Sequence, residues 1–224
     1  MDSNRRSPLV LILVLGSIWG FLEVVLGGAM KSASIPYRGD LLTGLGIGLM
    51  AVLLALWRKP AALLLVAVLA VAVKQLAVPI LHLPLFCGAN SCLAVGLAGG
   101  ALAGTSAVAG GRLGRGIAPR IATGVSAGLL GSTGFYLIGM HLAPCKYLLS
   151  FNRPGGYIGF MAAEGLIWAA LAGAFFPAGY VVGEKLGTVL DGARARSPVA
   201  YFAALGTIVV AAWVASGIAI ASGL

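Results

Sequence analysis

Three ionisable residues lie inside segments that are otherwise apolar enough to cross a lipid bilayer. Glu23 lies in GSIWGFLEVVLGG, Lys74 in AVLAVAVKQLAV, and Glu164 in GYIGFMAAEGLIW. A charge at the bilayer centre costs on the order of 3 kcal/mol on insertion scales, so such residues usually pair or belong to a site. A carboxylate binds cations or accepts hydrogen bonds, and an ammonium neutralises it. These three residues are the first candidates for chemistry.

Helical spacing gives each carboxylate a distinct surrounding. Gly16 and Gly20 share the face of Glu23, so this carboxylate should point into the helix bundle rather than at lipid. The same spacing predicts an apolar and aromatic wall around Glu164, made of Tyr157, Phe160, Met161 and Trp168. An apolar lining with a few orienting polar groups is typical of a small-ligand site.

Histidines and cysteines form a second set. LHLPLFCGANSC contains His82, Cys87 and Cys92, and HLAPC contains His141 and Cys145. Thiolates and imidazoles bind zinc, copper(I) or nickel, but the spacing matches no strong zinc pattern. A disulfide among the three cysteines, and cysteines that pack as small apolar residues, are the alternatives. We therefore expect no cofactor in this chain beyond a possible bound metal ion.

The elements that position these residues are predicted from composition. The chain is 60% hydrophobic and only 9% charged, with 34 glycines, and its mean hydropathy is +1.02. This balance excludes a soluble domain and indicates one integral membrane domain over 1–224 in a lipid bilayer. Windows of about 20 apolar residues predict an all-α polytopic bundle of about seven spans, with six as the alternative. The predicted spans are 8–30, 41–57, 60–80, 85–109, 117–140, 157–182 and 198–222.

The distribution of Lys and Arg predicts the orientation. If the N-terminus is cytoplasmic, ten of these residues fall on the inner side and four on the outer side. This bias is expected because short loops rich in Lys and Arg stay in the cytoplasm. The apolar run from Pro8 to about Met30 is too long for a signal peptide, so we expect a retained first span. With this topology, Glu23, Lys74 and Glu164 all lie in the outer half of the membrane. Asn90, near the outer start of the fourth span, joins the same layer.

Other functional signatures are weak. No basic run interleaved with aromatic residues indicates nucleic-acid binding, and no P-loop indicates nucleotide binding. GVSAG at 124–128 resembles a hydrolase elbow, but that motif needs a strand-to-helix turn and this segment is a predicted transmembrane helix. We therefore expect a binding protein and not an enzyme.

GSIWGFLEVVLGG, followed by IPYRGDLLTGLGIGLM and a third span bearing Lys74, resembles the substrate-binding S components of energy-coupling factor transporters. The resemblance covers roughly 1–110. It implies a multi-pass helical bundle in a bacterial or archaeal plasma membrane, which binds a vitamin-like molecule or metal ion from outside. It also implies docking on a transmembrane coupling subunit, served by separate ATPases, through Gly16 and Gly20. The family usually has six helices and an acidic residue in the fourth helix. This chain has seven predicted spans and no acidic residue in the fourth.

The preferred hypothesis is capture of a small solute at an outward pocket. The pocket would comprise Glu23, Lys74, Asn90, Tyr157, Phe160, Glu164 and Trp168. Three alternatives stay open: a Glu23–Lys74 pair that only fixes helix register, a thiol-disulfide oxidoreductase that uses the outer-face cysteines, and a structural subunit of a larger complex.

Overall fold

The fold is known from a computed structural model that describes residues 8–84 and 88–223. Over these residues the chain is helical, and seven segments are long and apolar enough to cross a membrane. They are Leu9–Ser32, Arg38–Trp57, Ala62–Leu81, Ala89–Arg115, Ile117–Leu142, Gly156–Arg196 and Pro198–Ala221. The predicted all-α polytopic fold is confirmed, with seven candidate spans rather than six.

Several spans are built from more than one helical piece. In chain order the elements are α1 (Pro8–Phe21), η2 (Leu22–Leu26), α2 (Gly27–Ser32), α3 (Arg38–Trp57), α4 (Ala62–Lys74), α5 (Ala77–Leu81), α6 (Ala89–Ala109), η3 (Gly110–Arg115), α7 (Ile117–Leu142), α8 (Lys146–Leu149), α9 (Gly156–Phe160), η4 (Met161–Gly165), α10 (Leu166–Arg196) and α11 (Pro198–Ala221). The elements η2 and η4 are π-helical turns, and η3 is a 3₁₀ turn.

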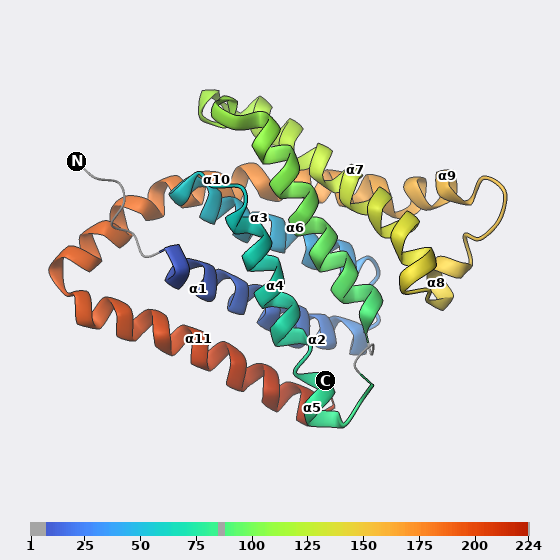
Figure 1. Cartoon of the computed structure of the whole chain (residues 1–224), viewed down its shortest axis with the longest axis horizontal. Helices are drawn as coiled ribbons and strands as arrows, with labels where there is room; N and C mark the ends of the chain where they lie inside the picture. Colours follow the sequence, from blue (N-terminus) through green and yellow to red (C-terminus); the bar gives the residue numbers. More distant parts are fainter. Residues whose placement is uncertain (1–7, 85–87, 224) are drawn as a thin grey trace.

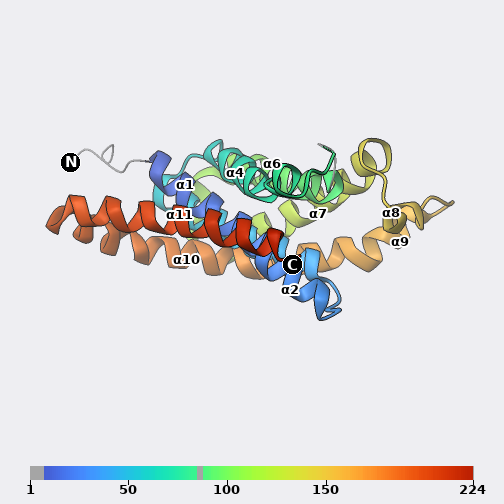
Figure 2. The same ribbon diagram turned by 90° about the horizontal axis from the view of Figure 1, so that it is seen from below.

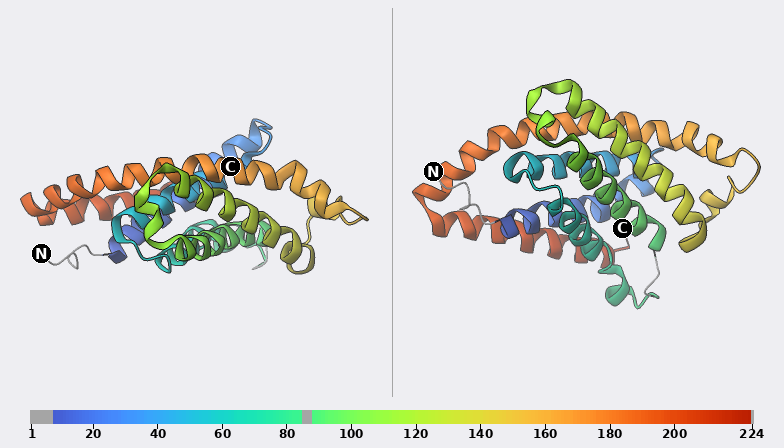
Figure 3. Two further views of the ribbon diagram at one scale, coloured as in Figure 1. Left: turned by 90° about the horizontal axis from the view of Figure 1, so that it is seen from above. Right: turned by 45° about the horizontal axis from the view of Figure 1, so that its top comes forward.

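The helices form a flattened bundle around α3. Helix α3 packs against α10 and also touches α1 and α6, while α7 packs between α6 and α10 (Figure 1). Seen from below, α10 and α11 lie on one face, and α4 and α6 lie on the opposite face (Figure 2). The same two layers are visible from above (Figure 3). Because α3 is covered from several sides, it is the most buried of the spans.

Close approach between helices depends on small residues. Trp19 of α1 is fully buried, and a Cβ on Gly46 of α3 would meet its indole ring at 2.1 Å. A Cβ on Gly16 or Gly20 would meet α4 side chains at 2.6 or 2.5 Å. These glycines therefore let α1 contact its neighbours inside the chain, which is the usual role of small residues in membrane helices.

Not every glycine repeat packs within the chain. Gly124 and Gly128 of α7 lie against the backbone of α10, at 2.3 and 2.6 Å from the position of an added Cβ. By contrast, Gly96, Gly100 and Gly104 of α6 have open space at that position. Four-residue spacing alone thus predicts a small helix face correctly, but not whether another helix covers it.

The connections define two ends of the bundle, which we call the basic end and the opposite end. The basic end comprises the α3–α4 turn with Arg58 and Lys59, the η3 turn, and the α10–α11 turn at 197. The opposite end comprises the α2–α3 turn, the end of α5 and the start of α6, together with α8 and α9, which lie next to each other at one side of the molecule (Figure 1).

Candidate functional site

The two carboxylates predicted as site residues lie in π-helical turns. Glu23 belongs to η2 and Glu164 to η4, and each turn interrupts an otherwise α-helical span. A π turn inserts one extra residue into the helix, and such turns are frequent at functional sites because they shift side chains out of the α-helical register. Neither turn was predicted from the sequence.

Glu23 is neutralised by a cation. Lys74 Nζ of α4 donates to Glu23 Oε2 at 2.6 Å, and the side chain of Glu23 is only 7% exposed. This observation confirms that the two residues pair. Next to Lys74, Gln75 Nε2 donates to Cys92 Sγ at 3.3 Å, which links the end of α4 to the start of α6. Asn90 lies half-buried in that same first turn of α6.

Glu164 has different partners. Tyr147 Oη of α8 donates to Glu164 Oε1 at 2.5 Å. The carboxyl group of Asp40, in the first turn of α3, lies within side-chain hydrogen-bonding range of Glu164 and of Trp168. The structure thus places two carboxyl groups side by side. Among the described residues, neither takes part in an ion pair with Lys or Arg.

Asp40 is the most enclosed acid of this group. The residue is 2% exposed, and its Oδ2 atom has no hydrogen-bond partner in the part of the chain that the structure describes. A buried polar atom without a partner forfeits about 1–3 kcal/mol of solvation, so its presence requires an explanation. Sequence reasoning missed Asp40 because an acid in the first turn of a helix is usually an exposed partner of the helix dipole. No signal in the local sequence shows that α10 buries it.

Aromatic rings enclose the Glu164 side of this pair. Phe160 and Trp168, both predicted, are buried, and the Trp168 ring stacks on Phe135 of α7 with centroids 5.9 Å apart. Phe160 also contacts Tyr136 at 5.2 Å and Phe151 at 5.6 Å. The rings of α7 and of the α8–α9 connection were not predicted, because they come from distant parts of the chain.

Two tyrosines border the site towards the surface. Tyr147 is 47% exposed, and Tyr157, also predicted, is 40% exposed with its hydroxyl 3.1 Å from Thr133 Oγ1. Burial and the neighbouring Glu164 carboxylate raise the pKa of Tyr147 above its usual range. The Tyr147 hydroxyl therefore stays protonated at neutral pH and acts as a donor.

The contacts divide the predicted pocket into two groups. One group contains Glu23 and Lys74. The other, which we call the acid–aromatic site, contains Asp40, Glu164, Tyr147, Trp168 and Phe160. Asp40 and Tyr147 both interact with Glu164, and Tyr147 also interacts electrostatically with Asp40. The interactions of these two residues do not include Glu23 or Lys74. Each group must therefore be tested by itself.

The predicted metal ligands do not converge over the described residues. There, no three or more His, Cys, Asp or Glu side chains are arranged to hold a metal ion. His82 ends α5 and His141 lies near the end of α7, both exposed. Cys92 and Cys145 form no disulfide with each other. Cys87 lies outside the described residues, so the disulfide and redox alternatives stay predictions.

The predicted docking glycines already have a neighbour. The face of α1 that carries Gly16 and Gly20 is buried against α4. Packing within the chain thus accounts for both residues. Comparison of the chain with protein-family models, curated proteins and solved structures gives no match.

Proposed function

We propose that this membrane protein captures a small cationic solute at the acid–aromatic site. The proposal rests on the proximity of the Asp40 and Glu164 carboxyl groups, together with Asp40 Oδ2, a buried oxygen without a hydrogen-bond partner among the described residues. Two adjacent carboxylates in a medium of low dielectric constant repel each other unless they share a proton or a positive charge lies between them. A bound cation would supply that charge and the missing partner of Asp40.

The surrounding side chains fit a cation with an apolar body. Trp168 interacts with Asp40, Phe160 is buried in the aromatic cluster around Phe135, and aromatic faces attract cations. Tyr147 holds Glu164 by a short hydrogen bond, which fixes the carboxylate without neutralising it. In this arrangement Asp40 and Glu164 bind the positive charge, and the rings contact the rest of the solute.

The solute would arrive from the outer side of the membrane. The excess of Lys and Arg at the basic end favours a cytoplasmic location for that end, which leaves the acid–aromatic site near the outer surface. The half-exposed Tyr147 and Tyr157 lie between the site and the surroundings. Release to the cell would depend on separate energising subunits, as in the energy-coupling factor transporters that the first three spans resemble.

The test is calorimetric titration of the full-length protein in nanodiscs. The probe is N-methylpyridinium, an aromatic cation, and pyridine at mildly alkaline pH is its neutral analogue. We expect the cation to bind and the neutral analogue to bind at least about tenfold more weakly, since the attraction of a desolvated cation to aromatic faces contributes roughly 2 kcal/mol.

Two isosteric variants locate the binding site. Asp40→Asn and Glu164→Gln should each weaken binding of the cation about tenfold, while Asp191→Asn, which removes an exposed carboxylate near the basic end, should leave it unchanged. Equal affinity of the wild type, Asp40→Asn and Glu164→Gln would refute the assignment of the site.

A further inference from the structure

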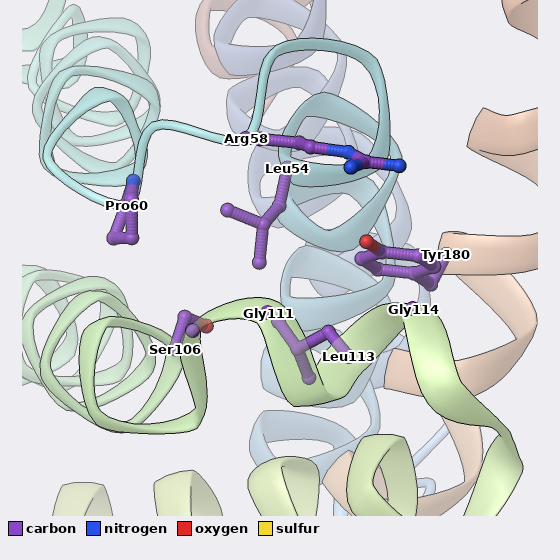
Figure 4. Close-up of a pocket in the computed structure, with 9 residues that line it drawn as sticks. Leu54, Arg58, Pro60, Ser106, Gly111, Leu113, Gly114 and Tyr180 are labelled. Atoms are coloured by element: carbon purple, nitrogen blue, oxygen red, sulfur yellow. The ribbon is translucent and has the colours of Figure 1, made fainter.

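A cavity at the basic end lies far along the bundle from the acid–aromatic site. It has a volume of about 110 Å³ and is lined by the α3–α4 turn, the end of α6, the η3 turn and one residue of α10 (Figure 4). Its lining includes Arg58, Ser106 and Tyr180, together with glycines 110, 111 and 114. A volume well below the roughly 300 Å³ of common small-molecule pockets fits a small ion or a single chemical group.

Ser106 contributes a buried hydroxyl that no described residue satisfies. The residue is 1% exposed, and its Oγ atom has no hydrogen-bond partner. A serine inside a helix usually donates to the carbonyl one turn earlier, as the adjacent Thr105 does to Ala101 at 2.9 Å. The Ser106 hydroxyl instead lies at the cavity wall (Figure 4). A buried hydroxyl of this kind requires a partner such as a water molecule, an ion or a ligand group.

Arg58 provides a positive charge above the same space. Its backbone has φ of 52°, in the left-handed region that non-glycine residues rarely adopt. This conformation ends α3 and directs the guanidinium across the mouth of the cavity towards Tyr180 (Figure 4). Among the described residues, the ion pairs join Glu23 with Lys74 and Arg120 with Glu184, so the charge of Arg58 is not neutralised by an acid there.

Arg120 makes one wall of the cavity rigid. Its Nε donates to the Leu113 carbonyl at 2.8 Å, and its two terminal nitrogens donate to Glu184 at 3.0 and 2.8 Å. Its guanidinium also lies over the Tyr180 ring, 4.2 Å from the centroid. These contacts fix η3 on α10 before any ligand binds, and Glu184 neutralises Arg120. Arg58 is therefore left as the positive charge that a ligand in the cavity can use.

We propose that this cavity binds a phosphate group. A guanidinium, a hydroxyl donor and a tyrosine beside a glycine-rich turn are the groups that commonly bind phosphate, because they donate several hydrogen bonds to one compact anion. The glycines of η3 carry no side chain that would keep the anion from the backbone. The phosphate belongs either to inorganic phosphate or to the headgroup of an anionic phospholipid in the adjacent leaflet.

The two sources are distinguished by titration of the full-length protein in maltoside detergent, which contains no phosphate. One arm uses sodium phosphate against sodium chloride at equal ionic strength, and the other uses a short-chain phosphatidylglycerol. Binding in the first arm alone identifies inorganic phosphate, and binding in the second alone identifies the lipid headgroup. Competition between the two titrants identifies a site that accepts both.

Three variants decide whether this cavity is the site. Arg58→Gln should weaken binding about tenfold, as expected for loss of one charge-assisted contact. Ser106→Ala should weaken it about threefold with unchanged thermal stability, since the hydroxyl makes no bond within the protein. Arg115→Gln removes an equal charge from an exposed position in η3 that does not line the cavity, and should have no effect.

The proposal is overturned if neither titrant binds the wild type, or if Arg58→Gln and Ser106→Ala bind as well as the wild type. It is equally overturned if Arg115→Gln weakens binding as much as Arg58→Gln, because the effect would then be general electrostatic attraction. None of these outcomes depends on the acid–aromatic site.

Discussion

The two π-helical turns carry the same residue type in different surroundings. Glu23 in η2 is paired with Lys74 at 2.6 Å, so its charge is compensated within the protein. Glu164 in η4 meets a tyrosine hydroxyl and a second acid, Asp40, instead of a cation. One carboxylate is therefore neutralised within the fold, and the other has no cationic partner among the described residues. The comparison separates a structural ion pair from a candidate binding site.

Removal of Lys74 tests the structural half of this comparison and should have the largest effect. Lys74→Met leaves Glu23 buried without its partner, which we expect to cost about 3 kcal/mol of unfolding free energy. The measurement is a denaturant titration in mixed micelles. Lys31→Met, at an exposed position of α2, is the control and should be neutral.

The double variant Glu23→Gln with Lys74→Met should recover most of that loss, because both charges are then absent. A double variant as unstable as Lys74→Met would show that packing of the lysine stem, and not the ion pair, stabilises the contact between α1 and α4.

Asp40→Asn tests the other half of the comparison. The change keeps the shape of the side chain and removes the repulsion from Glu164, so we expect stability equal to or above that of the wild type, within about 1 kcal/mol. The same denaturant titration measures it. A loss of stability like that of Lys74→Met would mean that Asp40 is as structural as Glu23.

The smallest expected effect is that of Tyr147→Phe. This change removes one hydrogen bond to Glu164, and we expect about threefold weaker cation binding with little change in the fold. The pKa of Tyr147 is raised in the folded protein. The folded protein therefore keeps this proton when the unfolded chain loses it, and stability falls as the pH rises above about 10.

That alkaline loss should be smaller in Tyr147→Phe than in the wild type, because the variant lacks the group that titrates. Thermal unfolding as a function of pH measures the difference. Identical alkaline profiles for the two proteins would show that the hydroxyl of Tyr147 is not held by Glu164.

The sequence predicts the seven apolar helices, because hydropathy acts over local windows that a single helix satisfies, but it does not predict that the sixth segment, expected over 157–182, continues to Arg196. It also gives the pairing of Glu23 with Lys74 as one alternative, beside a shared ligand, since two opposite charges at similar depth in lipid have few other partners. It does not predict Asp40 as a site residue. The burial of Asp40 depends on Trp168 and Glu164, more than 120 positions later in the chain.

The π turns and the cavity at the basic end escape sequence analysis for a related reason. A π turn has no composition of its own in LEVVL or MAAEG, so only the backbone shows it. The unpartnered hydroxyl of Ser106 depends on how η3 folds back over α6, and GGRLGR by itself indicates only a glycine-rich basic turn.

The most direct test of the central claim compares two double variants in one calorimetric titration with N-methylpyridinium. Asp40→Asn with Glu164→Gln removes both acids of the acid–aromatic site, and Glu23→Gln with Lys74→Met removes both charges of the ion pair. We predict that the first double variant loses cation binding and that the second binds within about twofold of the wild type. Retained binding in the first variant, or its loss only in the second, would contradict the account.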